Sequence, residues 1–298
     1  MSTSSGDDRA SGPDRLFALL QLCLPTRWLS ALIHRIANIR HTAIKNALIR
    51  LFLRGYTVDL REAEYLVPEN YASFNHFFTR ALRTGARPLP EAGDAFVSPV
   101  DGTVSQVGRI RDGRIFQAKG HEYSALELLG GDEEAARRFT DGLFCTIYLA
   151  PHNYHRIHMP IGGRLEKWSY VPGRLFSVNA ATARAMPRLF ARNERLNALF
   201  QTDAGGIAVT MVGALFVGSL ETVWAGCVSP PHVRGEPQRY ETMNPVMLAR
   251  GEELGRFNMG STVILLAEAG ALEWSAELTP GKVVRMGQSI GRWQRRSA

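Results

Sequence analysis

Three separated stretches of the sequence carry side chains that could act together in a reaction. Asp101 lies in "SPVDGTV", His155 and His158 lie in "APHNYHRIHMP", and Ser261 opens the apolar run "STVILLAE". An acid, a histidine and a hydroxyl from distant parts of a chain can form a nucleophile, its base and the group that orients the base. The residue types therefore indicate a serine-centred reaction site.

Each of these residues also has an ordinary structural interpretation. Asp-Gly is a common tight-turn pair, and small residues such as Ser261 often precede a strand. His152 joins His155 and His158 at three-residue spacing, which invites a metal site. The residues between them do not suggest a helix that presents all three on one face, and further ligands would be required. We therefore expect no metal.

Ser261 does not fit a conventional serine hydrolase. The nucleophile of such enzymes lies in a G-x-S-x-G turn, whereas Met259 and Val263 occupy the two glycine positions here. The following residues, Val263 to Leu266, are typical of a buried β-strand. Ser261 is thus predicted to open a strand.

Composition and charge limit the class of protein. The 298 residues are 45% hydrophobic and 21% charged, which is typical of a globular chain. The three cysteines are scattered, which argues against a disulfide framework. Residues 1–14 are polar and predicted to be disordered. They lack the features of a signal peptide, and no later run reaches the roughly 18 apolar residues of a membrane span.

The net charge of +7 is concentrated near the N-terminus. Residues 15–58 contain no acidic side chain, and their basic residues alternate with apolar ones at helical spacing. Such a basic amphipathic segment, assigned to residues 15–66, indicates association with an anionic membrane surface, with Trp28 as an interfacial anchor. A break near residues 38–41 is expected because the basic residues rotate around one straight helix. Nucleic acid is not expected as a partner, since stacking aromatics are not interleaved with the charges.

Residues 67–298 are predicted to form a β-rich domain. Short apolar or alternating runs are separated by Gly, Asp and Pro, and two helical insertions interrupt them, near 121–140 and in the 180s. The expected fold class is α+β: a mostly antiparallel sheet or barrel-like core preceded by N-terminal amphipathic helices.

Several stretches in one order resemble the phosphatidylserine decarboxylase proenzymes of the prokaryotic type. They are "FNHFFTRALRTGARP", "SPVDGTV", "KGHEYSALELLG", "YHRIHMP", "VPGRLFSVN", "FNMGSTVI" and "VRMGQSIGRW". The resemblance extends from about residue 60 to residue 293. The family's Leu-Gly-Ser-Thr appears as Met259-Gly260-Ser261-Thr262, and Met for Leu is a mild apolar change.

The resemblance implies that the chain cuts itself between Gly260 and Ser261, giving residues 1–260 and 261–298. The Ser261 hydroxyl would attack the Gly260 carbonyl, elimination would free the upstream chain, and hydrolysis would leave a covalent pyruvoyl group in place of Ser261. His158 would act as the base and Asp101 would orient it. The family's activity would be decarboxylation of phosphatidylserine to phosphatidylethanolamine and CO2, through a Schiff base to the pyruvoyl group.

His155 is our candidate for the acid that protonates the carbon after decarboxylation. The resemblance places the protein in phospholipid biosynthesis, on the cytoplasmic side of the cell membrane as a peripheral protein. The two cleaved chains are expected to stay associated, and a homodimer is compatible with this picture. Two other interpretations stay open at this point: a pyruvoyl decarboxylase of a soluble amino acid, and a β-rich module like the lipoyl carriers, although the modified lysine turn of such carriers is missing.

Overall fold

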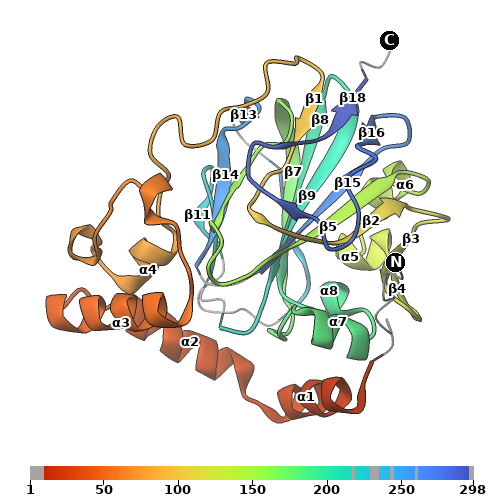
Figure 1. The fold of residues 1–298 in the computed structure, drawn as a ribbon. Helices are drawn as coiled ribbons and strands as arrows, with labels where there is room; N and C mark the ends of the chain where they lie inside the picture. The colour runs from red at the N-terminus through yellow and green to blue at the C-terminus, as the bar shows by residue number, and fades with distance from the viewer. Residues whose placement is uncertain (1–9, 217–218, 229–234, 242–244, 259–260, 295–298) are drawn as a thin grey trace, which may run out of the picture.

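Three helices open the part of the chain that the structure describes. The computed structural model describes all residues except 1–9, 217–218, 229–234, 242–244, 259–260 and 295–298 (Figure 1). The helices are α1 (Gly12–Cys23), α2 (Thr26–Ala37) and α3 (Thr42–Gly55). The predicted break at 38–41 separates α2 from α3, and a second break at residues 24–25 was not predicted.

Helix α1 begins within the stretch that was expected to be disordered. Ser11 and Asp14 form a reciprocal capping box, and a proline follows at the start of the helix. These contacts satisfy N–H groups that a helix otherwise leaves without partners at its first turn. Local capping therefore moves the helix start to Gly12, three residues before the predicted boundary.

A small aromatic cluster joins α3 to the segment that follows it. This segment contains η1 (Leu60–Glu62), η2 (Pro68–Asn70) and α4 (Phe74–Phe78). Tyr71 and Phe77 are fully buried and pack with Phe52 of α3. Lys45 of α3 is also buried, where its Nζ donates to the backbone carbonyls of η2. The Lys45 side chain thus binds inside the protein and does not belong to the exposed basic surface.

The main sheet has nine strands, and every pair of named strands in it is antiparallel. Its central strand, β15, lies between β9 and β5, and all its residues are buried. In order across the sheet, the strands are β12 (Gln238–Glu241), β7 (Gly163–Val171), β8 (Arg195–Thr202), β9 (Gly205–Gly213), β15 (Ser261–Ala267), β5 (Leu143–Leu149), β2 (Gly102–Arg109) and β17 (Val283–Val284), with β13 (Met247–Leu248) also paired to β7.

A second, four-stranded sheet lies between the main sheet and the segment that contains α4 (Figure 1). Its order is β11 (Gly226–Cys227), β10 (Ser219–Thr222), β14 (Glu253–Asn258) and β6 (Arg156–His158). It contacts α4 and the residue after it through hydrogen bonds from Asn75 to Asn258 and from Arg156 to the Thr79 carbonyl. The histidine stretch therefore lies at an edge of this sheet, beside α4.

The other elements cover the two sheets. They are β1 (Ala95–Val97), β18 (Ser289–Trp293) and β16 (Leu272–Trp274) in one sheet, the hairpin β3 (Arg114–Ala118) and β4 (His121–Ser124), and the helices α5 (Ala125–Leu128), α6 (Glu133–Arg138), α7 (Ala180–Ala185) and α8 (Leu189–Arg192). The expected α+β class with mostly antiparallel sheets is confirmed. A barrel is not formed, because β12 and β17 end the main sheet without pairing with each other in the described part of the chain.

The N-terminal helices are too short to cross a membrane one by one. Among the described residues, no single helix has the length and apolar composition of a span. Helix α1 and the Trp28–Ala37 part of α2 reach that length and composition together, but a bend of 86° separates them.

Candidate functional site

Ser261 is the first residue of the central strand of the main sheet. It lies opposite Gly213 of β9 and Leu149 of β5 in the antiparallel register. The side chain is 1% exposed, and its Oγ has no hydrogen-bond partner among the described residues. A buried hydroxyl without a partner is unfavourable for folding, so its presence needs an explanation.

The chain changes sheets at the predicted cleavage site. Asn258 ends β14 in the four-stranded sheet, and Ser261 begins β15 in the main sheet. The side chain of Asn258 is fixed by Asn75, which donates to its Oδ1, and by a short hydrogen bond to Ser219. Gly260 lies outside the described residues. The bond predicted to break is therefore part of the link between two sheets, and each side of the link is held by its own strand.

His155 is fully buried beside α4. Its ring lies 4.1 Å from that of Phe78, centroid to centroid, and its Nδ1 is 2.8 Å from the carbonyl oxygen of Asn153. A carbonyl only accepts, so Nδ1 carries the proton and Nε2 is bare. No described residue hydrogen-bonds to Nε2. Burial, followed by the charge of Arg80, lowers the pKa of His155 to about 3, so the ring is neutral near pH 7.

The loop that carries His155 is held by Arg80. The Arg80 guanidinium is buried over the Phe77 ring and donates through Nη2 to the carbonyls of His152 and Asn153. The Asn153 carbonyl thus accepts from both Arg80 and His155. This shared acceptor fixes the orientation of the His155 ring.

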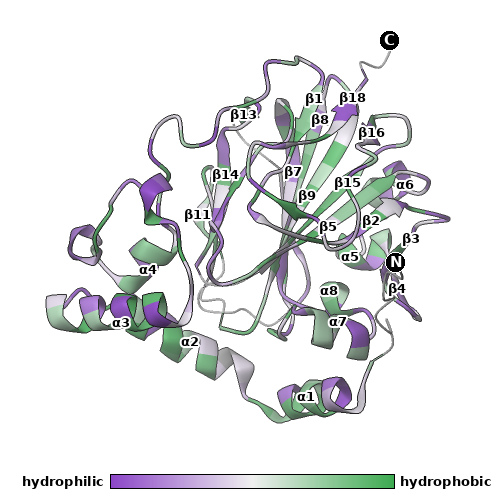
Figure 2. Ribbon diagram, viewed as in Figure 1, coloured by the Kyte–Doolittle hydropathy of each residue, from purple (hydrophilic) through white to green (hydrophobic). Residues whose placement is uncertain are grey.

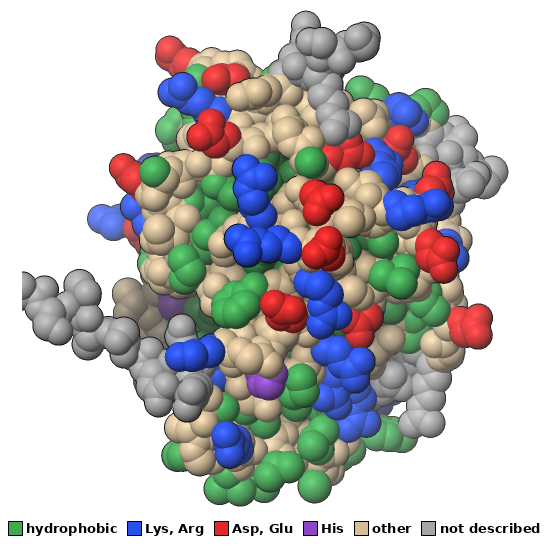
Figure 3. All heavy atoms as spheres, turned by 90° about the vertical axis from the view of Figure 1, so that its right-hand side faces the viewer, with side chains coloured by type: hydrophobic (Ala, Val, Ile, Leu, Met, Phe, Trp, Pro, Cys, Tyr) green, Lys and Arg blue, Asp and Glu red, His purple; other side chains and the backbone are tan. Residues whose placement is uncertain are grey.

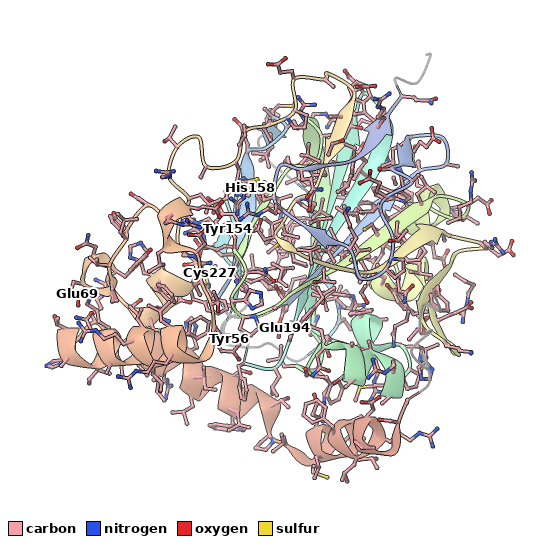
Figure 4. The ribbon with its side chains drawn as sticks, viewed as in Figure 1. Tyr56, Glu69, Tyr154, His158, Glu194 and Cys227 are labelled. Atoms are coloured by element: carbon pink, nitrogen blue, oxygen red, sulfur yellow. The ribbon has the colours of Figure 1, made fainter. Side chains whose placement is uncertain are left out.

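His158 lies in β6, where both ring nitrogens are engaged. Nδ1 is 2.8 Å from the Gly251 carbonyl and Nε2 is 2.8 Å from the Tyr154 hydroxyl. Figure 4 shows Tyr154 and His158 next to each other between α4 and the main sheet. Burial lowers the pKa of His158, against the opposing effect of the hydrogen bond to Gly251.

Asp101 lies in the loop between β1 and β2, and both of its carboxylate oxygens are bound. Oδ1 accepts from the backbone N–H of Met286 at 2.7 Å, and Oδ2 forms an ion pair with Arg87 at 2.9 Å. Arg87 also pairs with Glu62, which in turn pairs with Arg285. Position 102, next to Asp101, requires glycine because a Cβ there would lie 2.5 Å from the Tyr148 carbonyl oxygen.

Among the described residues, no hydrogen bond joins Asp101, His155, His158 or Ser261 to another of the four. A polar cavity of about 170 Å³ is lined by Asp101, Arg87, Tyr154 and the loop before His155. The charge of Asp101 raises the pKa of His158, which places the two within electrostatic reach. Their direct partners, however, are Arg87 for Asp101 and Tyr154 for His158. Asp101 therefore acts on His158 through space in this arrangement.

Three neighbours of the site, Arg87, Tyr154 and Gly251, were not predicted from the sequence. Tyr154 lies in the loop before β6 and His158 ends that strand, so no single periodicity predicts their contact. The signal for Arg87 was its place in "GARP", a stretch that supported the family resemblance without assigning a partner. In the described part of the chain, no three His, Cys, Asp or Glu side chains are gathered as a metal site would require.

Comparison with known proteins gives two matching family models. The model described as phosphatidylserine decarboxylase matches residues 74–292, and a model described as PSD matches residues 16–57. The first of these spans most of the β-rich region and includes Asp101, His155, His158 and Ser261.

The chain is also similar to several proteins named phosphatidylserine decarboxylase proenzyme. It is 52% identical over 282 residues to the protein of Ectopseudomonas mendocina, and the aligned region covers 94% of this chain and 99% of the relative. It is 50% identical to the Stutzerimonas stutzeri protein, over 94% of this chain and 95% of the relative. It is 51% identical to the Shewanella loihica protein, over 94% of this chain and 99% of the relative.

Proposed function

The chain belongs to the phosphatidylserine decarboxylase family, and we propose that it matures by cutting itself at Gly260–Ser261 and then decarboxylates phosphatidylserine with a pyruvoyl group made from Ser261. Membership in this family makes the protein a decarboxylase and removes the carrier-module interpretation. The observation that carries the cleavage proposal is the buried Ser261 hydroxyl, which has no partner among the described residues and lies where the chain passes from one sheet to another.

In the proposed maturation, the Ser261 hydroxyl attacks the Gly260 carbonyl and an ester replaces the amide. Elimination then breaks the ester and releases residues 1–260 with a new carboxyl terminus. Water displaces the nitrogen of residue 261 as ammonia and leaves the pyruvoyl carbonyl. His158 takes the proton from the Ser261 hydroxyl, and the Asp101 carboxylate stabilises the resulting imidazolium by its charge.

The fold supports the expectation that the two products stay together. Strand β15 lies between β5 and β9, which belong to the long product, and β18 pairs with β1 of the long product. The hydrogen bond from the Met286 N–H to Asp101, and the ion pair between Arg285 and Glu62, add contacts across the two products. A cut between residues 260 and 261 therefore removes no strand from either sheet.

The residues at the cut fit a pyruvoyl group. Removing the Ser261 side-chain hydroxyl deletes a buried polar atom that has no partner among the described residues, and His155 is a buried neutral histidine with a bare Nε2. When formed, the pyruvoyl group supplies an electron sink for the departing carboxylate. His155 can receive a proton at Nε2 while its Nδ1 remains bonded to Asn153, and can return that proton to the substrate carbon that loses CO2.

Replacing Asp101 with asparagine is expected to accumulate the uncut 298-residue chain. Asparagine can still accept from the Met286 N–H, but it lacks the charge that favours protonated His158. We expect scission to slow by about 10²-fold, measured by denaturing gel over time. Asp59→Asn is a matched control, because Asp59 lines the same cavity and pairs with exposed Arg61. Scission of Asp101→Asn at the rate of the control would remove Asp101 from maturation.

The N-terminal helices support the proposal that the substrate lies in a membrane. Helix α1 turns polar side chains toward the protein, where Asp14 pairs with Arg184 and Gln21 bonds to Thr182. Its apolar side chains face outward instead: Leu16, Leu19 and Leu20 are 57–60% exposed, and Trp28 of α2 is 81% exposed. Figure 2 shows hydrophobic positions along both helices, and in Figure 3 hydrophobic side chains gather at the lower end of the molecule. A core helix would bury this face, so we propose that it contacts lipid at the cytoplasmic surface of the cell membrane.

Changing Leu16, Leu19 and Leu20 together to serine is expected to release the protein from vesicles. Each leucine adds roughly 1.5–3 kcal/mol when its side chain leaves water, so the partition coefficient should fall by about 10²-fold or more. Co-sedimentation with vesicles that contain phosphatidylserine measures this. The control is Met247→Ser with Val223→Ser, which changes exposed apolar residues outside the helices. Equal binding by both variants would contradict the assignment of α1 as the lipid-facing surface.

A further inference from the structure

The hydrogen bonds of His158 define which of its nitrogens carries the proton. The Gly251 carbonyl can only accept, so Nδ1 of neutral His158 is the N–H that donates to it over 2.8 Å. Nε2 is then the bare nitrogen, and the Tyr154 hydroxyl must donate to it over 2.8 Å. The nitrogen that would accept the Ser261 proton is therefore held by Tyr154 in the uncut chain.

The Gly251 carbonyl is held in place by its own backbone. Gly251 has a backbone φ of +84°, which residues with a side chain rarely adopt, and its N–H donates to the Met159 carbonyl at 2.9 Å. A Cβ at this position would lie 2.5 Å from Cδ1 of Leu89. The acceptor for Nδ1 is thus part of a turn that requires glycine.

Tyr154 is placed to act only as a donor. It is 3% exposed, its ring stacks on that of His158 at 5.6 Å with an angle of 28°, and burial raises the pKa of its hydroxyl far above neutral pH. The phenol therefore keeps its proton over the range in which histidines titrate. Both its stacking and its hydrogen bond restrain the same imidazole.

We propose that Tyr154 is a positioning residue of maturation: its hydroxyl donates to Nε2 of His158, keeps that nitrogen unprotonated and holds the ring in place until the Ser261 hydroxyl takes its position. The inference rests on the proposed self-cleavage with His158 as base. It adds Tyr154 and the Gly251 carbonyl as the two groups that set the protonation state of that base. Gly251 fixes the tautomer, and Tyr154 stabilises the neutral ring.

A pH-dependent rate is the direct consequence, because a donor on Nε2 favours neutral His158. The other charges that act on this ring are Glu253 and Asp101, which raise its pKa, and Arg156, which lowers it. Glu253 pairs with Arg156 at 2.8 Å, and Asp101 pairs with Arg87. Both carboxylates are therefore engaged by guanidinium groups in ion pairs. Tyr154 is then the neighbour whose removal shifts the His158 titration without changing a charge.

The test is the pH dependence of scission in Tyr154→Phe. Full-length chain made by cell-free translation is transferred to buffers from pH 5 to 9, and the loss of uncut chain is followed by denaturing gel. Loss of one neutral hydrogen bond should raise the pKa of His158, so the acid limb of the rate should move up by about half to one pH unit. After the rates of each protein are divided by its own plateau rate, the Tyr154→Phe rate on that limb should be about three- to tenfold below that of the unchanged protein at the same pH.

Tyr123→Phe is the matched control, since Tyr123 is a fully buried tyrosine of β4 that packs on Phe190. A substitution that only weakens the fold would lower the scission rate by the same factor at every pH and leave the acid limb at its pH. The Tyr123 variant should therefore have its acid limb at the same pH as the unchanged protein. An unmoved limb in Tyr154→Phe, with normal scission in the unchanged chain, would overturn this inference alone. Absence of scission in the unchanged chain would overturn the proposed function and this inference together.

A second measurement does not depend on scission. In Ser261→Ala protein with ¹⁵N-labelled histidine, NMR should find His158 protonated at Nδ1 and bare at Nε2 near neutral pH. Adding Tyr154→Phe should raise the pH at which this ring titrates. A His158 ring protonated at Nε2 rather than Nδ1, or a titration unchanged by the Phe substitution, would overturn the inference.

Discussion

Ser261→Ala is expected to yield one intact chain of 298 residues with no decarboxylase activity. Alanine has no hydroxyl to attack the Gly260 carbonyl, so neither the cut nor the pyruvoyl group can form. The unchanged protein should give two masses, for residues 1–260 and for a shorter chain of residues 261–298 whose amino terminus is blocked. Intact-mass spectrometry separates these outcomes, and CO2 release from phosphatidylserine vesicles measures activity.

The fold should tolerate this substitution well. The Ser261 hydroxyl is buried and has no hydrogen-bond partner among the described residues, so its loss removes an unfavourable group. Ser289→Ala in β18 is the matched control, because Ser289 lies in the same predicted short chain and its hydroxyl donates locally, to the Gly291 carbonyl. The control should cut and decarboxylate normally. Two chains from Ser261→Ala, or a single full-length mass from the unchanged protein, would contradict the maturation proposal.

The strand that opens on Ser261 could be predicted because its information is local. Val263 to Leu266 form an apolar run that begins with two β-branched residues, and the structure places them in the buried centre of the main sheet. The break near residues 38–41 was also local, since basic residues at five-residue spacing cannot share one helix face. Both predictions are confirmed. Helix α1 began earlier than expected because its capping box was not recognised in a polar stretch.

The contacts around the site could not be predicted in this way, because they join segments with no shared period. Asp101 meets Arg87 from a preceding loop and Met286 from the far end of the chain. The change of sheet between Asn258 and Ser261 depends on the pairing of β14 and β15 with different partners. A sequence pattern gives strands but not their partners when several registers would bury the same residues. The site residues were therefore identified by type and family resemblance, whereas their hydrogen bonds required the fold.

His155→Gln is expected to leave scission intact and to lower decarboxylation by about 10²–10⁴-fold, the usual contribution of a positioned acid or base. Glutamine keeps much of the volume next to Phe78, which an alanine would leave as a cavity. Its amide cannot take up a proton and return it to carbon. Because the pKa of His155 is about 3, the ring in the free enzyme is neutral from pH 5 to 8, and its own titration should produce no limb in that range.

The neutral state of His155 also dictates how it can serve as an acid. Nε2 is bare, so the proton that it delivers must first come from the substrate, whose ammonium group has one to lose as its nitrogen reacts with a carbonyl. His152→Gln is the control, since His152 lies in the same loop and packs against Tyr56 instead. It should decarboxylate within a few-fold of the unchanged protein. If His155→Gln blocks scission as completely as Ser261→Ala, then His155 acts in maturation, and the separation of roles between His158 and His155 is wrong.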